Sequence, residues 1–261
     1  MSGLRSADPR LKALGLGLLV AILAFAAWLL PRIPQPPAYH QFVDQSMCFG
    51  ISHCFDVSSN LPITLAGLAG LGFLASIAGR RAFLDQREAL PYALFFFAAM
   101  LAGLGSAYYH LAPDNGRLVW DRAAIALALM AWFAAILCER VSIGFGLRLL
   151  PWLVAAGLGS AFYWGWSETH GMGDLRAYGL MQLYSLLLIP LLLWLYPPRY
   201  SGDRDILAVI GLYLLALLCD LSDRSIATLT SDLVSGHTLK HLLAAGAAFW
   251  VAIRLKRRHP L

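Results

Sequence analysis

The stretch GSAYYHLAPDNGRLVWD, residues 105–121, joins two long apolar segments of this chain. One apolar segment covers residues 91–112 and the other covers residues 118–138. Each has about the 20 residues that an α-helix needs to cross the hydrocarbon core of a bilayer. The polar residues between the two segments therefore predict a short connection at a membrane surface, with one membrane-spanning helix before it and another after it.

The rest of the chain repeats this pattern. Of the 261 residues, 59% are hydrophobic and only 13% are charged, about half the charged fraction of a typical soluble domain. An open sheet edge cannot face lipid, so helices are expected for every span. We predict an all-α polytopic membrane protein with eight spans, at residues 12–30, 57–79, 91–112, 118–138, 147–166, 177–197, 206–222 and 236–255.

The first apolar segment has basic residues before it, as a signal peptide does. Its length, and the lack of a clear small-residue cleavage site before Pro31, favour a helix that is retained.

The basic residues predict an orientation. With the N-terminus placed inside, 14 of the 20 Lys and Arg residues fall on the inner side, four on the outer side and two within spans. Cytoplasmic loops carry this excess in membrane proteins, so both termini are predicted to be cytoplasmic. The net charge of +5 lies at loops and chain ends, which favours membrane orientation over nucleic-acid binding.

This topology brings polar residues from separate spans to the same depth. Ser106 and His110 lie near the outer end of the third span, and Asp121 near the outer start of the fourth. His237 and His241 lie in the first two turns of the last span, also at the outer end. Ionisable groups inside a membrane are candidates for a functional site.

The spacing of these residues predicts a metal site. His237 and His241 are four residues apart, so both rings leave one face of a helix. With His110 they would form a three-histidine set, which in zinc enzymes leaves a fourth position for water. Asp121 could accept a proton from that water.

Each part of this pattern also has a plainer interpretation. An HxxxH pair can be packing, and Asp121 and Arg122 can be an ion pair at the membrane edge. Asp220 is predicted to accept a hydrogen bond from a ligating histidine, whereas Asp223 could pair with Arg224. Lys240 is expected to face away from His237 and His241 and to reach the surface or an acid.

The four cysteines show no CxxC spacing. Cys138 and Cys219 lie within spans and are predicted to pack there. Cys48 and Cys54 share one loop, and the sequence leaves open whether they form a disulfide.

Taken together, SAYYH (residues 106–110), Asp121 and HTLKH (residues 237–241) resemble the alkaline ceramidases. These belong, with the progestin/adipoQ receptors, to a superfamily of seven-span membrane hydrolases. FDVSSNLPITLAGLAGL (residues 55–71) resembles the first core span of the family, and YHQFVDQ (residues 39–45) its bacterial branch.

The resemblance implies a seven-helix core with one extra N-terminal helix. Its domains would be an N-terminal tail with the extra helix (residues 1–35), an outer loop (36–56), the core (57–255) and a basic tail (256–261).

The same resemblance implies a zinc-dependent amidase that cleaves the N-acyl bond of a ceramide-like lipid taken from the bilayer. His110, His237 and His241 would bind zinc, and Ser106 and Asp121 would be catalytic. Calcium is not expected, because His53 stands where an acidic ligand would be, near Asp44 and Asp56. The implied location is a bacterial inner membrane, with the zinc near its periplasmic face. A lipid receptor with a structural zinc is the alternative.

Overall fold

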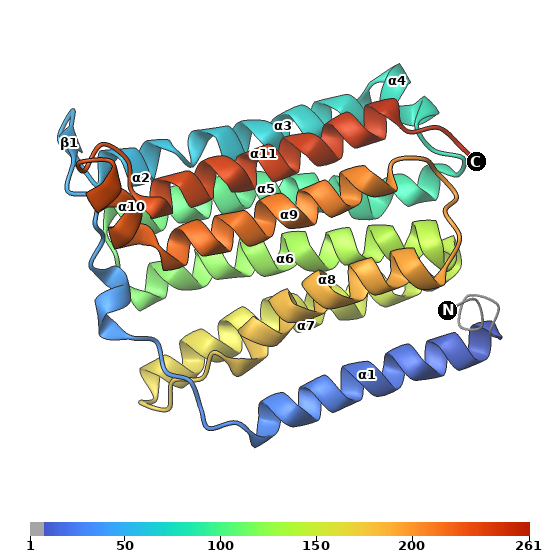
Figure 1. Ribbon diagram of the computed structural model, residues 1–261, viewed down its shortest axis with the longest axis horizontal. Coiled ribbons are helices and arrows are strands. Elements are labelled where there is room, and N and C mark those ends of the chain that lie inside the picture. Colours follow the sequence, from blue (N-terminus) through green and yellow to red (C-terminus); the bar gives the residue numbers. More distant parts are fainter. Residues whose placement is uncertain (1–7) are drawn as a thin grey trace.

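The chain forms a bundle of long helices that run side by side, with one small hairpin at one end of the bundle (Figure 1). The structure is a computed structural model and describes residues 8–261. Its helices are α1 (Pro9–Leu29), η1 (Pro37–His40), α2 (Cys54–Ser58), α3 (Leu61–Ala75), α4 (Ile77–Arg81), η2 (Gln86–Glu88), α5 (Ala89–Leu111), α6 (Asn115–Arg140), α7 (Ile143–Thr169), α8 (Arg176–Leu195), α9 (Asp203–Leu221), α10 (Asp223–Leu229) and α11 (Gly236–Arg257). The hairpin pairs β1 (Met47–Cys48) with β2 (Ile51–Ser52) in antiparallel register.

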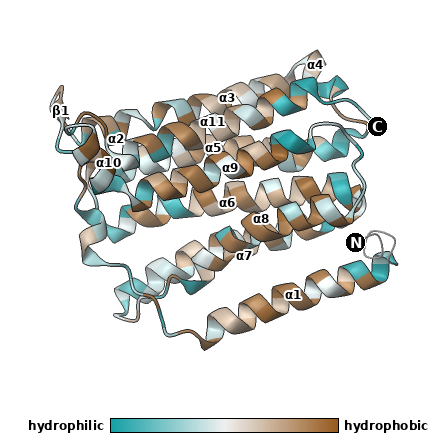
Figure 2. Cartoon of the chain, viewed as in Figure 1, coloured by the Kyte–Doolittle hydropathy of each residue, from teal (hydrophilic) through white to brown (hydrophobic). Residues whose placement is uncertain are grey.

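These helices confirm an all-α polytopic membrane protein. Within residues 8–261, seven helical segments are each long and apolar enough to cross a membrane. Hydrophobic residues make up much of the length of the long helices, and hydrophilic residues gather toward the helix ends (Figure 2). The predicted span at residues 206–222 corresponds to α9, which meets the same criteria only together with α10. The two helices are bent by 80° at the break between them.

Helix α6 lies at the centre of the bundle. It packs against α5, α7 and α8, and almost all of its apolar stretch is buried. Seven of the residues from Ala123 to Ala135 are alanine. Such small side chains allow neighbouring helix backbones to approach closely. The centre of the fold therefore comes from the segment that directly follows the polar connection at residues 112–114.

Helix α1 lies on the outside of the bundle against α8 (Figure 1). None of its residues is buried. Two side chains tie it down: Lys12 donates to the carbonyl of Leu195 at 3.0 Å, and Tyr184 donates to the carbonyl of Val20 at 2.8 Å. An added helix on the periphery leaves the interior of the bundle to the helices that follow.

Two ends of the bundle differ in what they bury. The end at which the chain terminates carries Glu139, whose carboxylate accepts from Arg254 at 2.7 Å, from Tyr92 at 2.6 Å and from Arg258. The opposite end, with the hairpin and α10, carries the buried histidines. At the end where the chain terminates, the buried carboxylate of Glu139 is thus paired with arginines, and a buried ion requires such a partner.

Candidate metal centre

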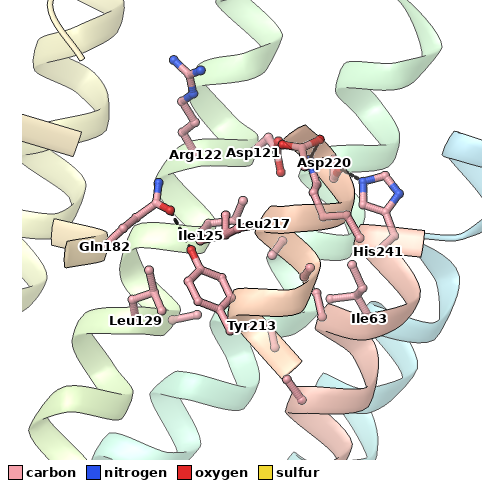
Figure 3. A pocket seen from close by; sticks show the side chains of 18 of the residues that line it. Ile63, Asp121, Arg122, Ile125, Leu129, Gln182, Tyr213, Leu217, Asp220 and His241 are labelled. Atoms are coloured by element: carbon pink, nitrogen blue, oxygen red, sulfur yellow. Dashed lines mark hydrogen bonds and ion pairs between the residues drawn. The ribbon is translucent and has the colours of Figure 1, made fainter. Parts of the chain in front are cut away.

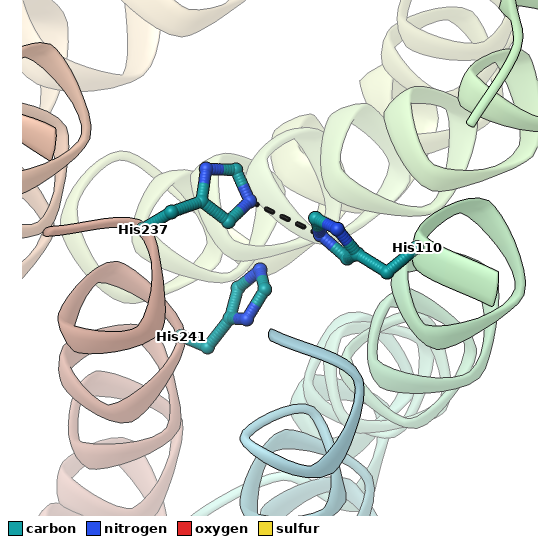
Figure 4. A group of neighbouring side chains, drawn as sticks. All are labelled: His110, His237 and His241. Atoms are coloured by element: carbon teal, nitrogen blue, oxygen red, sulfur yellow. Dashed lines mark hydrogen bonds between the residues drawn. The ribbon is translucent and has the colours of Figure 1, made fainter. Parts of the chain in front are cut away.

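Three histidine rings meet at the end of the bundle that carries α10 and the hairpin (Figure 4). His110 is the penultimate residue of α5, and His237 and His241 lie one turn apart at the start of α11. All three are buried, and one ring nitrogen from each lies within 4.8 Å of the others. Three buried imidazoles around one point could bind a metal ion, as the sequence predicts. A solvated surface pair would show neither the burial nor the third ring.

Close helix packing produces this meeting point. A Cβ at Gly236 would collide with the carbonyl oxygen of Cys219 and lie 2.7 Å from the Cα of Asp223, so only glycine allows α11 to begin this close to α9. The start of α11 is capped twice: Ser235 accepts from the amide of Thr238 at 2.9 Å, and Asp223 accepts from the amide of His237 at 2.8 Å. Asp223 therefore holds the backbone of His237.

Two of the rings are oriented by their Nδ1 atoms. His237 Nδ1 lies 2.6 Å from Asp220 Oδ1, and His241 Nδ1 lies 2.8 Å from Ser59 Oγ. The Nε2 atoms then face the centre, where those of His110 and His237 are 3.0 Å apart. Two nitrogens that share a tetrahedral zinc lie about 3.3 Å apart, given zinc–nitrogen bonds of about 2.0–2.1 Å. The donor set and its orientation therefore fit a metal ion, and hydrogen bonds to the outer nitrogens are usual at such sites.

The structure also places the two other predicted residues at this centre. Ser106 is buried and its Oγ lies 3.4 Å from His241 Nε2. Asp121 is buried and lines the same cavity as Ser106 and His241. Within residues 8–261, one carboxylate oxygen of Asp121 has no hydrogen-bond partner. A buried acceptor without a partner is costly. This oxygen is therefore available to accept a hydrogen bond or a proton from a molecule bound in the cavity.

The expected position of Lys240 is wrong. Its Nζ lies 3.3 Å from Asp220 and 3.2 Å from His237 Nε2, and the side chain lines the cavity with Asp121. Residues three apart on a helix lie close to one face, so the spacing from His237 to Lys240 carried the signal. The prediction that Lys240 pairs with an acid is confirmed by its contact with Asp220.

The loop before α2 folds onto the histidine site. Cys48 and Cys54 form a disulfide. Asp44 accepts from the amides of Ser46 and Asp56, both at 2.9 Å, and Asp56 accepts from Thr238 at 2.7 Å. These carboxylates thus fasten the loop to the start of α2 and α11.

A cavity of about 400 Å³ extends from this centre into the bundle. At one end it is lined by Ser106, Asp121, Asp220, Lys240 and His241, and further in by Ile63, Ile125 and Leu129 (Figure 3). Its apolar part reaches Phe95 and Trp132. Ser106 and Phe95 both belong to α5, so the lining spans about 16 Å along that helix at 1.5 Å per residue.

No model of a known protein family matches this chain, and no curated protein matches it either.

The contact between Asp220 and His237 leads to a first prediction. Changing Asp220→Asn removes the charge that orients the ring, so metal affinity is expected to fall about 10- to 100-fold. Competition with a chromophoric chelator measures this affinity. Asp205→Asn at the other end of α9 is the matched control, because Asp205 accepts from the indole of Trp250 at the surface, and it is expected to leave the affinity unchanged. Equal affinities in all three proteins would show that Asp220 does not support a metal ligand.

Proposed function

We propose that this protein is a zinc-dependent hydrolase, embedded in the membrane, that cleaves the amide bond of an N-acyl lipid. The observation that carries the proposal is the cluster of His110, His237 and His241, of which His241 lines the polar end of a mainly apolar cavity. Three histidine ligands are typical of catalytic zinc sites, which keep one position for water or substrate. Asp220 and Ser59 orient two of these ligands, as expected for a centre that must hold its ion firmly.

The residues around the cluster support hydrolysis. A bound zinc ion would supply Lewis-acid chemistry and lower the pKa of a water molecule to about 7. Asp121 has the free oxygen that accepts the proton of the attacking water and returns it to the leaving amine. Ser106 donates a hydrogen bond to the carbonyl oxygen as negative charge develops there. The carbon–nitrogen bond breaks, a carbon–oxygen bond forms, and the products are a fatty acid and an amine.

The shape of the cavity supports a lipid substrate. Its inner part is mainly apolar and follows α5 for about 16 Å from Ser106. The polar side chains of Gln182 and Tyr213 in this part satisfy each other by a hydrogen bond of 2.8 Å. An acyl chain therefore fits there with its amide beside His241. Gly179 of α8 and Leu217 of α9 line it, and these two helices contact each other little. A lipid would therefore reach the cavity sideways from the bilayer, between α8 and α9.

The resemblance to alkaline ceramidases favours a ceramide-like lipid as the substrate. The distribution of basic residues favours an inner membrane in which the histidine centre faces the periplasm and both termini face the cytoplasm.

Release of fatty acid from purified protein tests the proposal. The protein in detergent is incubated with N-acyl lipids that include ceramide, and free fatty acid is quantified by mass spectrometry. Turnover that stops with a chelator and returns with zinc supports a zinc hydrolase. Zinc bound without any product from the lipid panel would contradict hydrolysis and favour a lipid receptor of the same fold.

A further inference from the structure

Arg122 is a buried cation without a counter-ion at the polar end of the cavity. It is 6% exposed and lines the cavity beside Asp121. The other buried arginines in residues 8–261 all have a carboxylate partner: Arg140 pairs with Asp203, and Arg254 and Arg258 pair with Glu139. No ion pair of the described residues includes Arg122. The predicted alternative of an ion pair between Asp121 and Arg122 is therefore wrong, because successive residues leave a helix in different directions.

The contacts of Arg122 satisfy only part of its guanidinium. Nη2 donates to the side-chain oxygen of Gln35, and the group lies 3.9 Å from the ring centre of Trp164. The rings of Tyr178 and Tyr39 lie at 5.3 and 5.5 Å. Nη1 is buried and has no hydrogen-bond partner in the described part of the chain. Aromatic faces attract a cation, but they do not replace the hydrogen-bond acceptor that a buried N–H requires.

This arrangement is suited to hold an anion. A charged side chain buried in a bilayer-spanning bundle is costly unless it is paired. The aromatic rings fix the plane of the guanidinium, and the free Nη1 leaves a directed donor of the kind that binds carboxylate or phosphate. Figure 3 shows Arg122 and Asp121 leaving neighbouring positions of one helix, with the Arg122 guanidinium directed away from the Asp121 carboxylate and from Leu129 and Ile63.

We propose that Arg122 binds the anionic headgroup, a carboxylate or a phosphate, of the lipid that occupies this cavity. The lipid's acyl chain lies in the apolar part and its amide lies at the histidines. Applied to the substrate, this inference rests on the proposed hydrolase function; the anion site itself does not. If the proposed hydrolase function holds, the preferred substrate is an acidic N-acyl lipid and not an uncharged ceramide.

Lipid binding without turnover tests the anion site. Protein treated with a chelator, so that no metal contributes, is titrated in non-ionic detergent with a fluorescent fatty acid and with its uncharged methyl ester. The wild type is expected to bind the acid about 10- to 100-fold more tightly than the ester, as for a hydrogen bond to a charged group. Arg122→Gln is expected to bind both equally, and Arg122→Lys to keep part of the preference.

Arg117→Gln is the matched control, because Arg117 lies on the same helix but outside the cavity. It is expected to behave like the wild type. Binding is compared only among variants whose thermal unfolding midpoints match that of the wild type. An acid and ester that bind the wild type equally, or a preference that survives in Arg122→Gln, would overturn the anion site. Displacement of the fatty acid by excess inorganic phosphate would show a site for free anions and overturn the headgroup assignment.

Hydrolysis of matched substrates tests the headgroup in turnover. Ceramide and ceramide phosphate differ only in the phosphate, and an N-acyl amino acid adds a carboxylate. The wild type is expected to show a kcat/KM about 10-fold or more higher for the acidic lipids, and Arg122→Gln to lose this difference. Faster hydrolysis of ceramide would overturn the headgroup proposal and leave the amidase standing. A fatty-acid preference without cleavage of any amide would support the anion site and contradict the hydrolase.

Discussion

Replacing any one of His110, His237 and His241 by alanine is expected to lower bound metal from about one ion per chain to background. Each substitution removes one of three protein ligands, and a metal site with two imidazoles loses most of its affinity. Fatty-acid release is expected to fall to background with the metal. Elemental analysis of the purified variants by mass spectrometry measures the first effect, and the lipid assay measures the second.

The control for this series is His170→Ala. His170 is exposed near the end of α7 and lies outside the cluster. It is expected to keep both metal and activity. Retention of a full complement of metal in all three cluster variants would show that these rings pack against one another without holding an ion.

Asp121→Asn is expected to lower kcat about 10²- to 10⁴-fold while bound metal and KM stay close to those of the wild type. The amide keeps the shape of the side chain but cannot accept the proton of the attacking water, and general-base catalysis is worth about this factor. Steady-state kinetics on the best acyl lipid, together with metal analysis of the same samples, separates the two effects.

Asp114→Asn tests whether any change of charge near the start of α6 has the same result. Asp114 caps that helix and accepts from the amide of Arg117 at 2.8 Å, so its replacement is expected to leave kcat unchanged. A loss of metal in Asp121→Asn would identify Asp121 as a ligand, and an unchanged kcat would remove it from the reaction.

Much of the fold follows from the sequence because lipid limits the choice of structure. A segment as apolar as residues 118–138 can satisfy its backbone in a bilayer only as a helix, and α6 is that helix. The common depth of His110, His237 and His241 follows from topology, and helix packing then brings the three rings together. One span ends and another begins on the same side, so residues about 130 positions apart share a depth.

Other features depend on contacts that periodicity does not encode. The sequence predicts a span that ends near residue 222, but it does not predict the 80° break between α9 and α10. Helix α10 begins at this break with Asp223, whose carboxylate reaches the start of α11. The partner of His241, Ser59, lies 182 residues away. The surroundings of Arg122 come from Gln35 and Trp164, in segments that the sequence alone does not bring together.

X-ray absorption at the zinc edge of the purified wild-type protein measures both the metal in the histidine cluster and the atoms that bind it. One zinc ion per chain is expected, with nitrogen ligands at about 2.0–2.1 Å and no sulfur. Protein that is folded and active in lipid binding but contains no zinc, or zinc held by sulfur at about 2.3 Å, would contradict this expectation.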